Sequence, residues 1–232
     1  MRRALALFGL ILGLGICIEA QAPAASSASD PYAGSVKGRV YSNSFFGFSC
    51  EIPKGLQSEA ELMEKLRKDA SVKNKSSLDT IEAEHKRRGI LLQATHVEGM
   101  DRVTDAIPWT APNAEPIMII PRFGASFVIA AFPIPDSRSG AGAMEMAEDR
   151  AAQVRANNPG VVVSAPGRVM LNGQEFARFD QSESSPGGKP KPSWFASDFL
   201  TVRNGYTLEF LFSADSEKEL LRVMKAIQTV HF

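Results

Sequence analysis

The amino-acid sequence predicts an α+β domain with a hairpin-rich antiparallel sheet and interspersed helices. Apolar and polar residues alternate through the C-terminal third, which is the period of half-buried strands. Asn204-Gly205 separates two of these strands and is a strong signal for a type I′ hairpin turn. Ser216 followed by Glu219 is a helix-capping pair ahead of an apolar helical stripe. Hairpins and helices in this mixture are typical of the α+β class.

Length and charge restrict the function before any motif is considered. The chain has 232 residues, enough for one domain with a sizeable core. Its 26 basic and 26 acidic residues balance, and no basic stripe stands out. Nucleic-acid binders carry such a stripe. A nucleic-acid partner is therefore not predicted.

The first residues have the composition of an export signal. Arg2 and Arg3 precede an apolar stretch over 4–18, which has the length of a signal-peptide core and is too short for a spanning helix. We therefore expect residues 1–20 to be a signal peptide cleaved after Ala20. The mature chain would be periplasmic or secreted, with no transmembrane segment.

Two alternatives to this processing remain open. Cleavage after Ala22 would place Pro23 next to the cut, where its ring hinders the peptidase. Lipid anchoring at Cys17 would require a small residue before the cysteine, and Ile16 stands there. We favour simple cleavage, which leaves Cys50 as the single cysteine and excludes an internal disulfide.

Residues 21–37 are rich in Ala, Ser and Pro and predict a flexible linker, followed by one globular domain over 38–232. The domain opens on "YSNSFFGFSCEIPKGL", whose alternation predicts one strand entering the core. The strand's apolar face carries Phe46, Phe48, Cys50 and Ile52. Cys50 is thus predicted to be a structural thiol with a raised pKa.

The middle of the chain predicts helices and central strands. Ser58 and Glu61 form a capping box for the first helix, and Gly89 ends the second. Two of the strands are apolar on both faces, as central strands are. The expected helices cover 59–70, 77–88 and 141–157, and the expected strands cover 90–98, 116–123 and 126–134.

The C-terminal third predicts two hairpins and a closing helix. The first hairpin turns at Leu171-Asn172-Gly173 and the second at Asn204-Gly205. The helix after Ser216 carries its apolar residues at helical spacing. The four strands cover 161–170, 174–182, 194–203 and 206–214.

The residues with metal or nucleophile chemistry do not form a recognisable site. Glu82 and His85 have the E-x-x-H spacing of di-iron bundles, but no second helix supplies the other ligands. His96 and His231 have no zinc-ligand spacing. Gly124 to Val128 resembles a nucleophile elbow around Ser126 but lacks its last glycine. No metal and no cofactor are predicted.

Two further patterns have a structural and a functional interpretation. Gly140 and Gly142 could offer amides to a phosphate, but they are better explained as the lead-in to a helix. Charged residues in neighbouring strands form a second pattern, for which cross-strand pairing is the default expectation. These residues are Arg178, Asp180, Asp198 and Glu209. No catalytic, cofactor-binding or metal-binding residue is assigned.

The order of motifs resembles the PsbP-like superfamily. "YSNSFFGFSCEIPKGL" is similar to its opening strand, and "VMLNGQEFARFD", "NGYTLEFLFSAD" and "SEKELLRVMKAIQTVHF" are similar to its closing hairpins and helix. The resemblance implies a central antiparallel sheet with helices on both faces, an α/β/α sandwich. It also implies a non-catalytic role in binding or stabilising partners, and it supplies no catalytic residues.

We therefore expect a non-enzymatic, exported binding or accessory protein of the cell envelope with a protein partner. The alternative is an exported, hydrolase-like enzyme whose site uses Asp198, Glu209 and Arg178. For a binding protein, the long loops over 99–115 and 182–193 are candidate contact segments, because long irregular loops are often functional. Trp109 and Trp194 would anchor the partner there, unless both indoles belong to the core.

Overall fold

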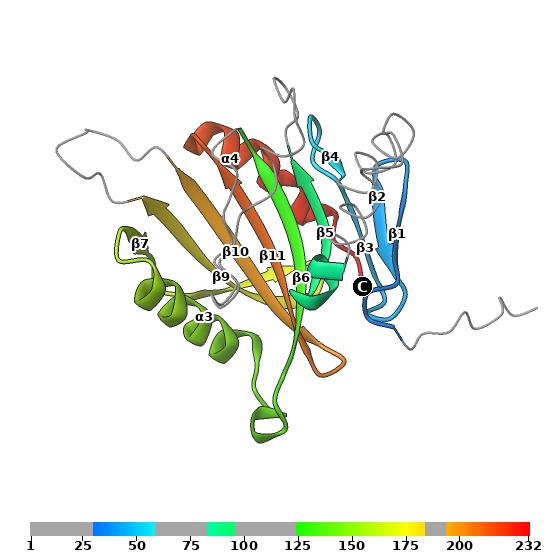
Figure 1. The fold of residues 1–232 in the computed structure, drawn as a ribbon, viewed down its shortest axis with the longest axis horizontal. Helices are drawn as coiled ribbons and strands as arrows, with labels where there is room; N and C mark the ends of the chain where they lie inside the picture. The colour runs from blue at the N-terminus through cyan, green and yellow to red at the C-terminus, as the bar shows by residue number, and fades with distance from the viewer. Residues whose placement is uncertain (1–29, 59–82, 96–123, 184–193) are drawn as a thin grey trace, which may run out of the picture.

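The computed structural model describes residues 30–58, 83–95, 124–183 and 194–232 (Figure 1). Several predictions concern residues outside these ranges. These are the signal peptide and Cys17, the helix over 59–70, the start of the helix over 77–88, the end of the strand over 90–98, the strand over 116–123, most of the loop over 99–115 and of that over 182–193, Glu82, His96 and Trp109.

The main sheet has eight antiparallel strands and confirms the α+β class. Its order is β4-β5-β6-β11-β10-β9-β7, and β8 also pairs with β9. The central position predicted for the strand over 126–134 is confirmed, because β6 lies between β5 and β11. The strands are β4 (Gln57–Ser58), β5 (Ile90–Thr95), β6 (Ser126–Pro133), β7 (Val161–Val163), β8 (Gly167–Leu171), β9 (Gln174–Glu183), β10 (Phe195–Arg203) and β11 (Tyr206–Ala214).

Both predicted hairpin turns are present. Asn204 and Gly205 have φ angles of 51° and 77°, as a type I′ turn requires, and they join β10 to β11. Asn172 and Gly173 have φ angles of 50° and 81° and join β8 to β9. These turns fix the register of the C-terminal strands.

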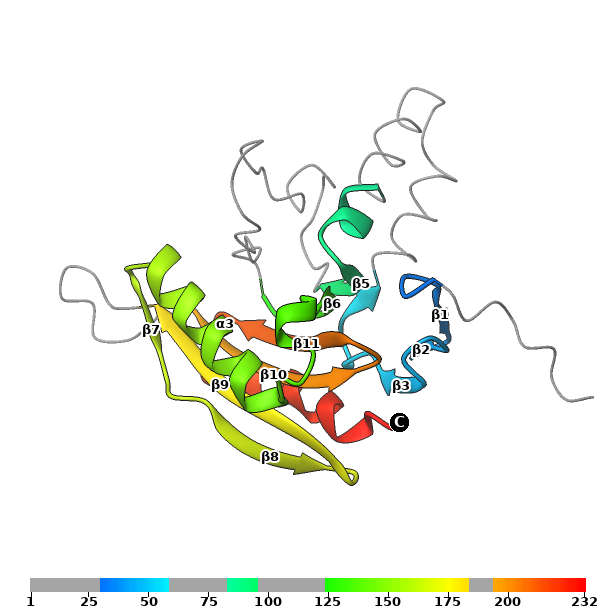
Figure 2. The same ribbon diagram turned by 90° about the horizontal axis from the view of Figure 1, so that it is seen from below.

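The prediction of one strand over 161–170 is wrong, because two separate strands, β7 and β8, occupy these residues. β7 pairs with β9 at residues 181–183, and β8 pairs with β9 at residues 174–178 (Figure 2). Pro166 lies between β7 and β8, and proline has no amide hydrogen to donate to a ladder. The long strand β9 therefore has two partners along one edge.

The opening aromatic segment is a hairpin rather than the single strand that was predicted. β2 (Val40–Asn43) pairs with β3 (Phe48–Glu51), and the turn contains Phe46 and Gly47. The φ angle of Gly47 is 67°, which suits glycine, and the amide of Phe46 donates to Asn43 Oδ1 at 3.2 Å. The chain reverses here because an Asx turn and a left-handed glycine interrupt the alternation.

The predicted burial in this segment is confirmed although the backbone differs. Phe46, Phe48, Cys50 and Ile52 are all at most 3% exposed. A second correction concerns the linker, because β1 (Gly34–Lys37) pairs with β2. Residues 34–37 therefore belong to the folded domain, which begins before residue 38.

The described helices agree with the predicted ones. α3 (Ala143–Asn157) buries Ala147, Ala151 and Val154, as its periodicity indicated. α4 (Glu217–Val223) is capped by Ser216, which accepts a hydrogen bond from the amide of Glu219, and it continues into the 3₁₀ helix η5 (Met224–Thr229). Residues 83–87 are helical, and η3 (Asp136–Arg138) is a short 3₁₀ helix before α3. None of the helices in the described ranges has the length and apolar character of a membrane span.

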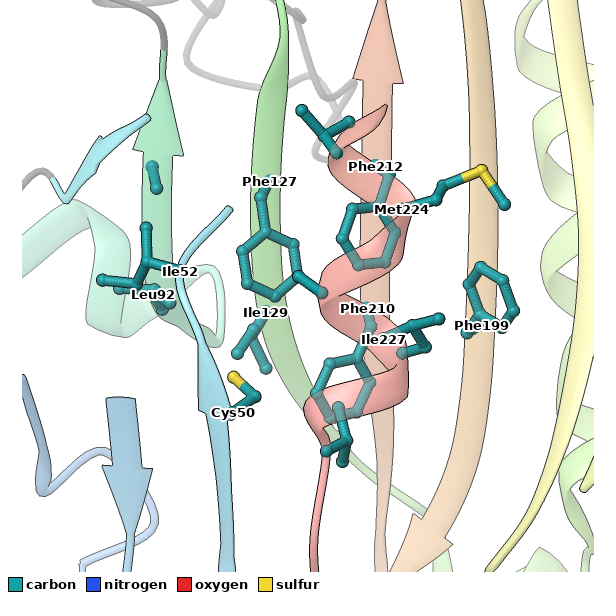
Figure 3. Packing of buried hydrophobic residues seen from close by; sticks show 14 of the residues in the cluster. Cys50, Ile52, Leu92, Phe127, Ile129, Phe199, Phe210, Phe212, Met224 and Ile227 are labelled. Atoms are coloured by element: carbon teal, nitrogen blue, oxygen red, sulfur yellow. The ribbon is translucent and has the colours of Figure 1, made fainter. Parts of the chain in front are cut away.

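Three apolar clusters lie among the described residues, and the two larger ones hold these elements together. The larger cluster contains Phe199, Phe210 and Phe212 of the main sheet together with Met224 and Ile227 of η5 (Figure 3). In it, the rings of Phe127 and Phe212 stack with centroids 4.6 Å apart. The smaller cluster joins α3 to Ala177, Phe179 and Leu200.

Candidate functional site

Two acidic side chains lie side by side on neighbouring strands of the main sheet. Asp198 of β10 is opposite Leu211 of β11, and Glu209 of β11 is opposite Leu200 of β10. Asp198 and Glu209 are therefore diagonal neighbours on one face of the sheet. Their residues are 0% and 2% exposed, so both carboxyl groups are removed from water.

Each carboxyl group accepts a hydrogen bond from a side chain among the described residues. Gln181 of β9 donates from Nε2 to Asp198 Oδ2 at 2.7 Å. Arg150 of α3 donates from Nε to Glu209 Oε1 at 2.9 Å. Asp198 Oδ1 has no donor among the described residues, and the neighbouring group is the Glu209 carboxylate. A proton on Asp198 turns this contact between two acceptors into a hydrogen bond.

Burial raises the pKa of Asp198 well above its ordinary value of 3.8, and the Glu209 carboxylate raises it further. Arg150 and Gln181 act in the opposite direction but do not compensate for the burial. This direction favours the protonated form of Asp198, which can donate to Glu209, while Arg150 binds Glu209 from the other side. Two buried carboxylates in contact would repel each other and would both lack solvation.

Arg150 is held between α3 and the sheet. Its helix buries Ala147 and Ala151, so the position at 150 lies beside the buried stripe and faces β11. Its side chain is 23% exposed, and its guanidinium carbon is 5.9 Å from the ring centre of Phe132. An arginine can reach this site because its methylene groups pack over the sheet while its guanidinium group hydrogen-bonds to Glu209.

A small pocket of about 40 Å³ opens beside this ion pair. Ile90, Ala130 and Glu209 are aligned across β5, β6 and β11 and form part of its floor. Arg88 and Arg150 provide its cationic groups. The described residues that line it are Arg88, Ile90, Val128, Ala130, Phe132, Arg150, Glu209 and Leu211. Apart from Glu209, the walls from the sheet are apolar.

Arg88 is positioned by the helical turn before β5. It donates from Nε to Glu84 Oε1 at 2.6 Å, and its side chain is 11% exposed. Arg87 binds the same carboxylate but is 69% exposed and does not line the pocket. Two arginines that share one carboxylate hold the Glu84 pKa at about 2. Gly89, with a φ angle of 72°, ends the turn.

The charged lattice predicted from the sequence divides into two clusters. Asp198 and Glu209 come together, whereas Arg178 binds Asp180, with Nη2 and Oδ1 2.8 Å apart. Arg178 is opposite Phe199, and Asp180 is opposite Ser197. Because successive residues of a strand alternate between faces, Arg178 and Asp180 lie on the face opposite Asp198. The hydrolase-like set of Asp198, Glu209 and Arg178 is thus not assembled.

The other candidate residues occupy structural positions. Ser126 is buried, and its hydroxyl is 2.7 Å from that of Ser213. His231 forms a backbone bridge with Ser49, and Gly142 is the N-cap residue of α3. Burial raises the pKa of the Cys50 thiol to about 12, as predicted. Across the described ranges, no group of three His, Cys, Asp or Glu side chains is arranged to hold a metal ion.

Trp194 packs against the sheet beside the pocket. It is half-buried against a small cluster of Val128, Ala196 and Leu211, and two of these three residues also line the pocket. Its Nε1 is buried and has no hydrogen-bond partner among the described residues. These contacts favour the interpretation that the Trp194 indole belongs to the core over the interpretation that it anchors a partner.

Sequence reasoning missed Arg88, Arg150 and Gln181. A signal for Arg150 was present, because it adjoins the apolar positions 147, 151 and 154 of a helix. An arginine beside a buried stripe can extend its side chain toward an acidic partner beneath the helix. Gln181 likewise continues the face of Ala177 and Phe179 on β9. Arg88 had no signal, because it stands in a run of three basic residues, 86–88.

Comparison with known proteins gives a structural likeness. No family profile matches the sequence, and no curated protein matches it. The solution structure of cyanobacterial PsbP (CyanoP) from Synechocystis sp. PCC 6803 is similar, with 12% identity and a TM-score of 0.47 over 86% of this chain and 98% of that one. A protein of unknown function, PA94 from Pseudomonas aeruginosa, is 17% identical with a TM-score of 0.33 over 45% of this chain and 70% of that one.

Proposed function

We propose that the protein is a non-enzymatic binding or accessory protein of the cell envelope, and that the pocket beside Arg150 is its ligand-binding site. The pocket combines apolar walls from β5, β6 and β11 with the head groups of Arg88, Arg150 and Glu209. Concave sites with apolar walls and a few converging polar groups are typical binding sites. This combination is the observation that carries the proposal.

The acid pair supports binding better than catalysis. General acid–base chemistry needs groups that reach the substrate. Asp198 is 0% exposed and is not among the residues that line the pocket. Glu209 reaches the pocket but is already bound to Arg150. The pair thus serves to position Arg150, and a hydrolase-like enzyme is the weaker candidate.

The proposal includes the layered arrangement of an α/β/α sandwich. Leu200 packs with α3, whereas its neighbour Phe199 packs in the cluster that includes α4 and η5. Adjacent residues of a strand point to opposite faces. This alternation along β10 supports helices on both faces of the sheet.

Export is proposed from the composition of residues 1–20. We expect the protein recovered from the native envelope to begin at Gln21, which intact-mass spectrometry can establish. A lipid-modified N-terminus at Cys17 would replace the soluble, periplasmic or secreted location with a membrane-anchored one.

The binding function is tested by comparing capture with turnover. The chain from residue 21 is immobilised and exposed to native envelope extract as wild type, Ala130→Val and Arg87→Gln. Ala130 lines the pocket, so the larger valine should fill it and abolish retention of the specific partner. Arg87 lies outside the pocket, and its variant should retain that partner.

The same proteins are assayed with chromogenic ester, phosphate and glycoside substrates. We expect no turnover above the uncatalysed rate. Turnover by the wild type that is lost in folded Asp198→Asn and Glu209→Gln variants would establish the enzyme instead. Equal capture by wild type and Ala130→Val would remove the pocket from the proposed function.

A further inference from the structure

We propose that Asn172-Gly173, in the turn between β8 and β9, is a site of spontaneous deamidation, and that conversion of Asn172 to an acid releases the C-terminal segment over 228–232. The reaction needs water as its only co-reactant. It is independent of the proposed ligand-binding site, because the pocket beside Arg150 is lined by other residues.

The turn leaves room for this reaction. Asn172 and Gly173 are both exposed, with φ angles of 50° and 81°. Glycine has no side chain to hinder an attack by its own backbone nitrogen on the preceding side chain. A Cβ placed at Gly173 would meet no described atom within 4 Å. Water and a five-membered ring are therefore both accommodated at this turn.

The reaction exchanges an amide for an acid without oxidation or reduction. The backbone nitrogen of Gly173 attacks Cγ of Asn172, and its proton passes to the side-chain amide. The new N–Cγ bond forms as the Cγ–Nδ2 bond breaks, and ammonia leaves. Water then opens the cyclic imide at one of its two carbonyl groups. The product is aspartate at position 172, or its isomer in which the backbone runs through the side chain.

The side-chain amide of Asn172 connects the turn to the C-terminal end of the chain (Figure 2). Its Nδ2 donates to the carbonyl oxygens of Gln228, at 2.9 Å, and of Val230, at 2.7 Å. These carbonyls lie at the end of η5, where a helix leaves its last carbonyl groups without partners inside the helix. A carboxylate has no hydrogen to donate, so conversion removes both hydrogen bonds and places a negative charge against two acceptors.

The segment that Asn172 holds completes the core and reaches the first hairpin. Val230 is 1% exposed and belongs to the larger apolar cluster. His231 exchanges two backbone hydrogen bonds with Ser49 of β3, at 2.9 and 3.0 Å. Segments near a chain end open easily unless they are tied down. Loss of the Asn172 hydrogen bonds should therefore loosen both the packing of Val230 and the bridge to β3.

The conversion itself is measured by mass spectrometry. The chain from residue 21 is incubated in mildly alkaline buffer, both folded and in denaturant, and is then digested with trypsin. The peptide over 169–178 contains Asn172, and the peptide over 204–218 reports the second Asn-Gly turn separately. Because the turn is exposed, the folded chain should convert Asn172 within about tenfold of the rate in denaturant. Conversion of Asn172 in denaturant alone would overturn the inference.

Three variants test the structural consequence. Asn172→Asp reproduces the product, and Asn172→Gly removes the donors without adding charge, since glycine also adopts positive φ. Asn158→Asp is the control, because Asn158 Nδ2 likewise donates to a helix carbonyl, that of Val154 at 3.2 Å, but at the end of α3.

Hydrogen exchange of peptides covering 224–232 is the measurement, and peptides covering 195–214 report that each variant remains folded. Asn172→Asp should accelerate exchange over 224–232 at least about tenfold, Asn172→Gly less, and Asn158→Asp not at all. An equal acceleration by the two variants at 172 would overturn the role of charge repulsion. Unchanged exchange in Asn172→Asp, or the same acceleration in Asn158→Asp, would overturn the release of the C-terminal segment.

Discussion

At the scale of single residues, the buried carboxyl of Asp198 makes stability depend on pH. Its pKa is raised well above 3.8 in the folded protein, whereas in the unfolded chain it returns to its ordinary value. Between these two values the folded state binds one more proton than the unfolded state. The free energy of unfolding therefore falls as pH rises through this window, by about 1.4 kcal/mol per pH unit from this group.

Asp198→Asn should remove this pH dependence. Asparagine can accept from Gln181 through its oxygen and donate to Glu209 through its amide, so it reproduces the protonated acid. We expect the variant to gain stability relative to wild type by about 1.4 kcal/mol per pH unit above pH ~4, up to the folded pKa. Urea unfolding at several pH values measures the difference. A difference that stays constant with pH would mean that Asp198 is ionised in the fold.

Cys50 should be inert while the protein is folded. Burial raises its pKa to about 12, so about one thiol in ten thousand is ionised at pH 8, and its side chain is 1% exposed. The chain from residue 21 should show no reaction with a disulfide-exchange reagent in buffer and one equivalent in denaturant. Rapid labelling of the native protein would contradict the core position of Cys50.

At the scale of elements, Gly89 connects the helical turn to β5. Its φ angle is 72°, its carbonyl accepts from the amide of Ala131 at 2.8 Å, and a Cβ there would lie 2.3 Å from Ala131 O. An alanine at position 89 would therefore be strained by the left-handed backbone conformation and would clash with the carbonyl oxygen of Ala131. The glycine is needed for β5 to pair closely with β6 and for Arg88 to reach the pocket.

Gly89→Ala should lower the free energy of unfolding by about 2 kcal/mol or more. Gly140→Ala is the control, because Gly140 is exposed and a Cβ there meets no atom within 4 Å. The control should change stability by less than about 0.5 kcal/mol. Denaturant unfolding measures both, and equal effects would refute the role of Gly89.

At the scale of the whole molecule, the two larger apolar clusters differ in the side chains that they bury. The larger cluster contains the fully buried rings of Phe127, Phe210 and Phe212. The smaller one attaches α3 through Ala143, Ala147, Ala151 and Val154. Alanines bury little apolar area, so α3 is held by less hydrophobic free energy than the central strands.

Hydrogen exchange should therefore show α3 opening before the sheet. We expect amides of α3 to exchange at least about tenfold faster than those of β10 and β11, through local rather than global unfolding. Exchange followed by mass spectrometry of peptides covering 143–157 and 195–214 tests this. Equal protection in the two regions would show that α3 and the sheet unfold as one cooperative unit.

The sequence by itself determined the elements whose signals are local. Asn204-Gly205 identified the β10–β11 hairpin because only residues that tolerate positive φ suit a type I′ turn. The signals for the N-cap at Ser216 and for the apolar stripe of α3 were also local, since capping and periodicity are properties of residues close together in the sequence. The sequence also placed Asp198 and Glu209 in neighbouring strands, as members of a charged group that included Arg178 and Asp180.

Only the tertiary structure decided what depends on contacts between distant residues. Phe46 alternates correctly with Phe48 yet lies in a turn, because Asn43 and Gly47 reverse the chain there. Arg178 was grouped with Asp198 in the sequence, and the register placed it on the opposite face. The pocket joins a helical turn, three strands and α3, so its two arginines, 62 positions apart in the chain, meet only because the sheet brings their elements together.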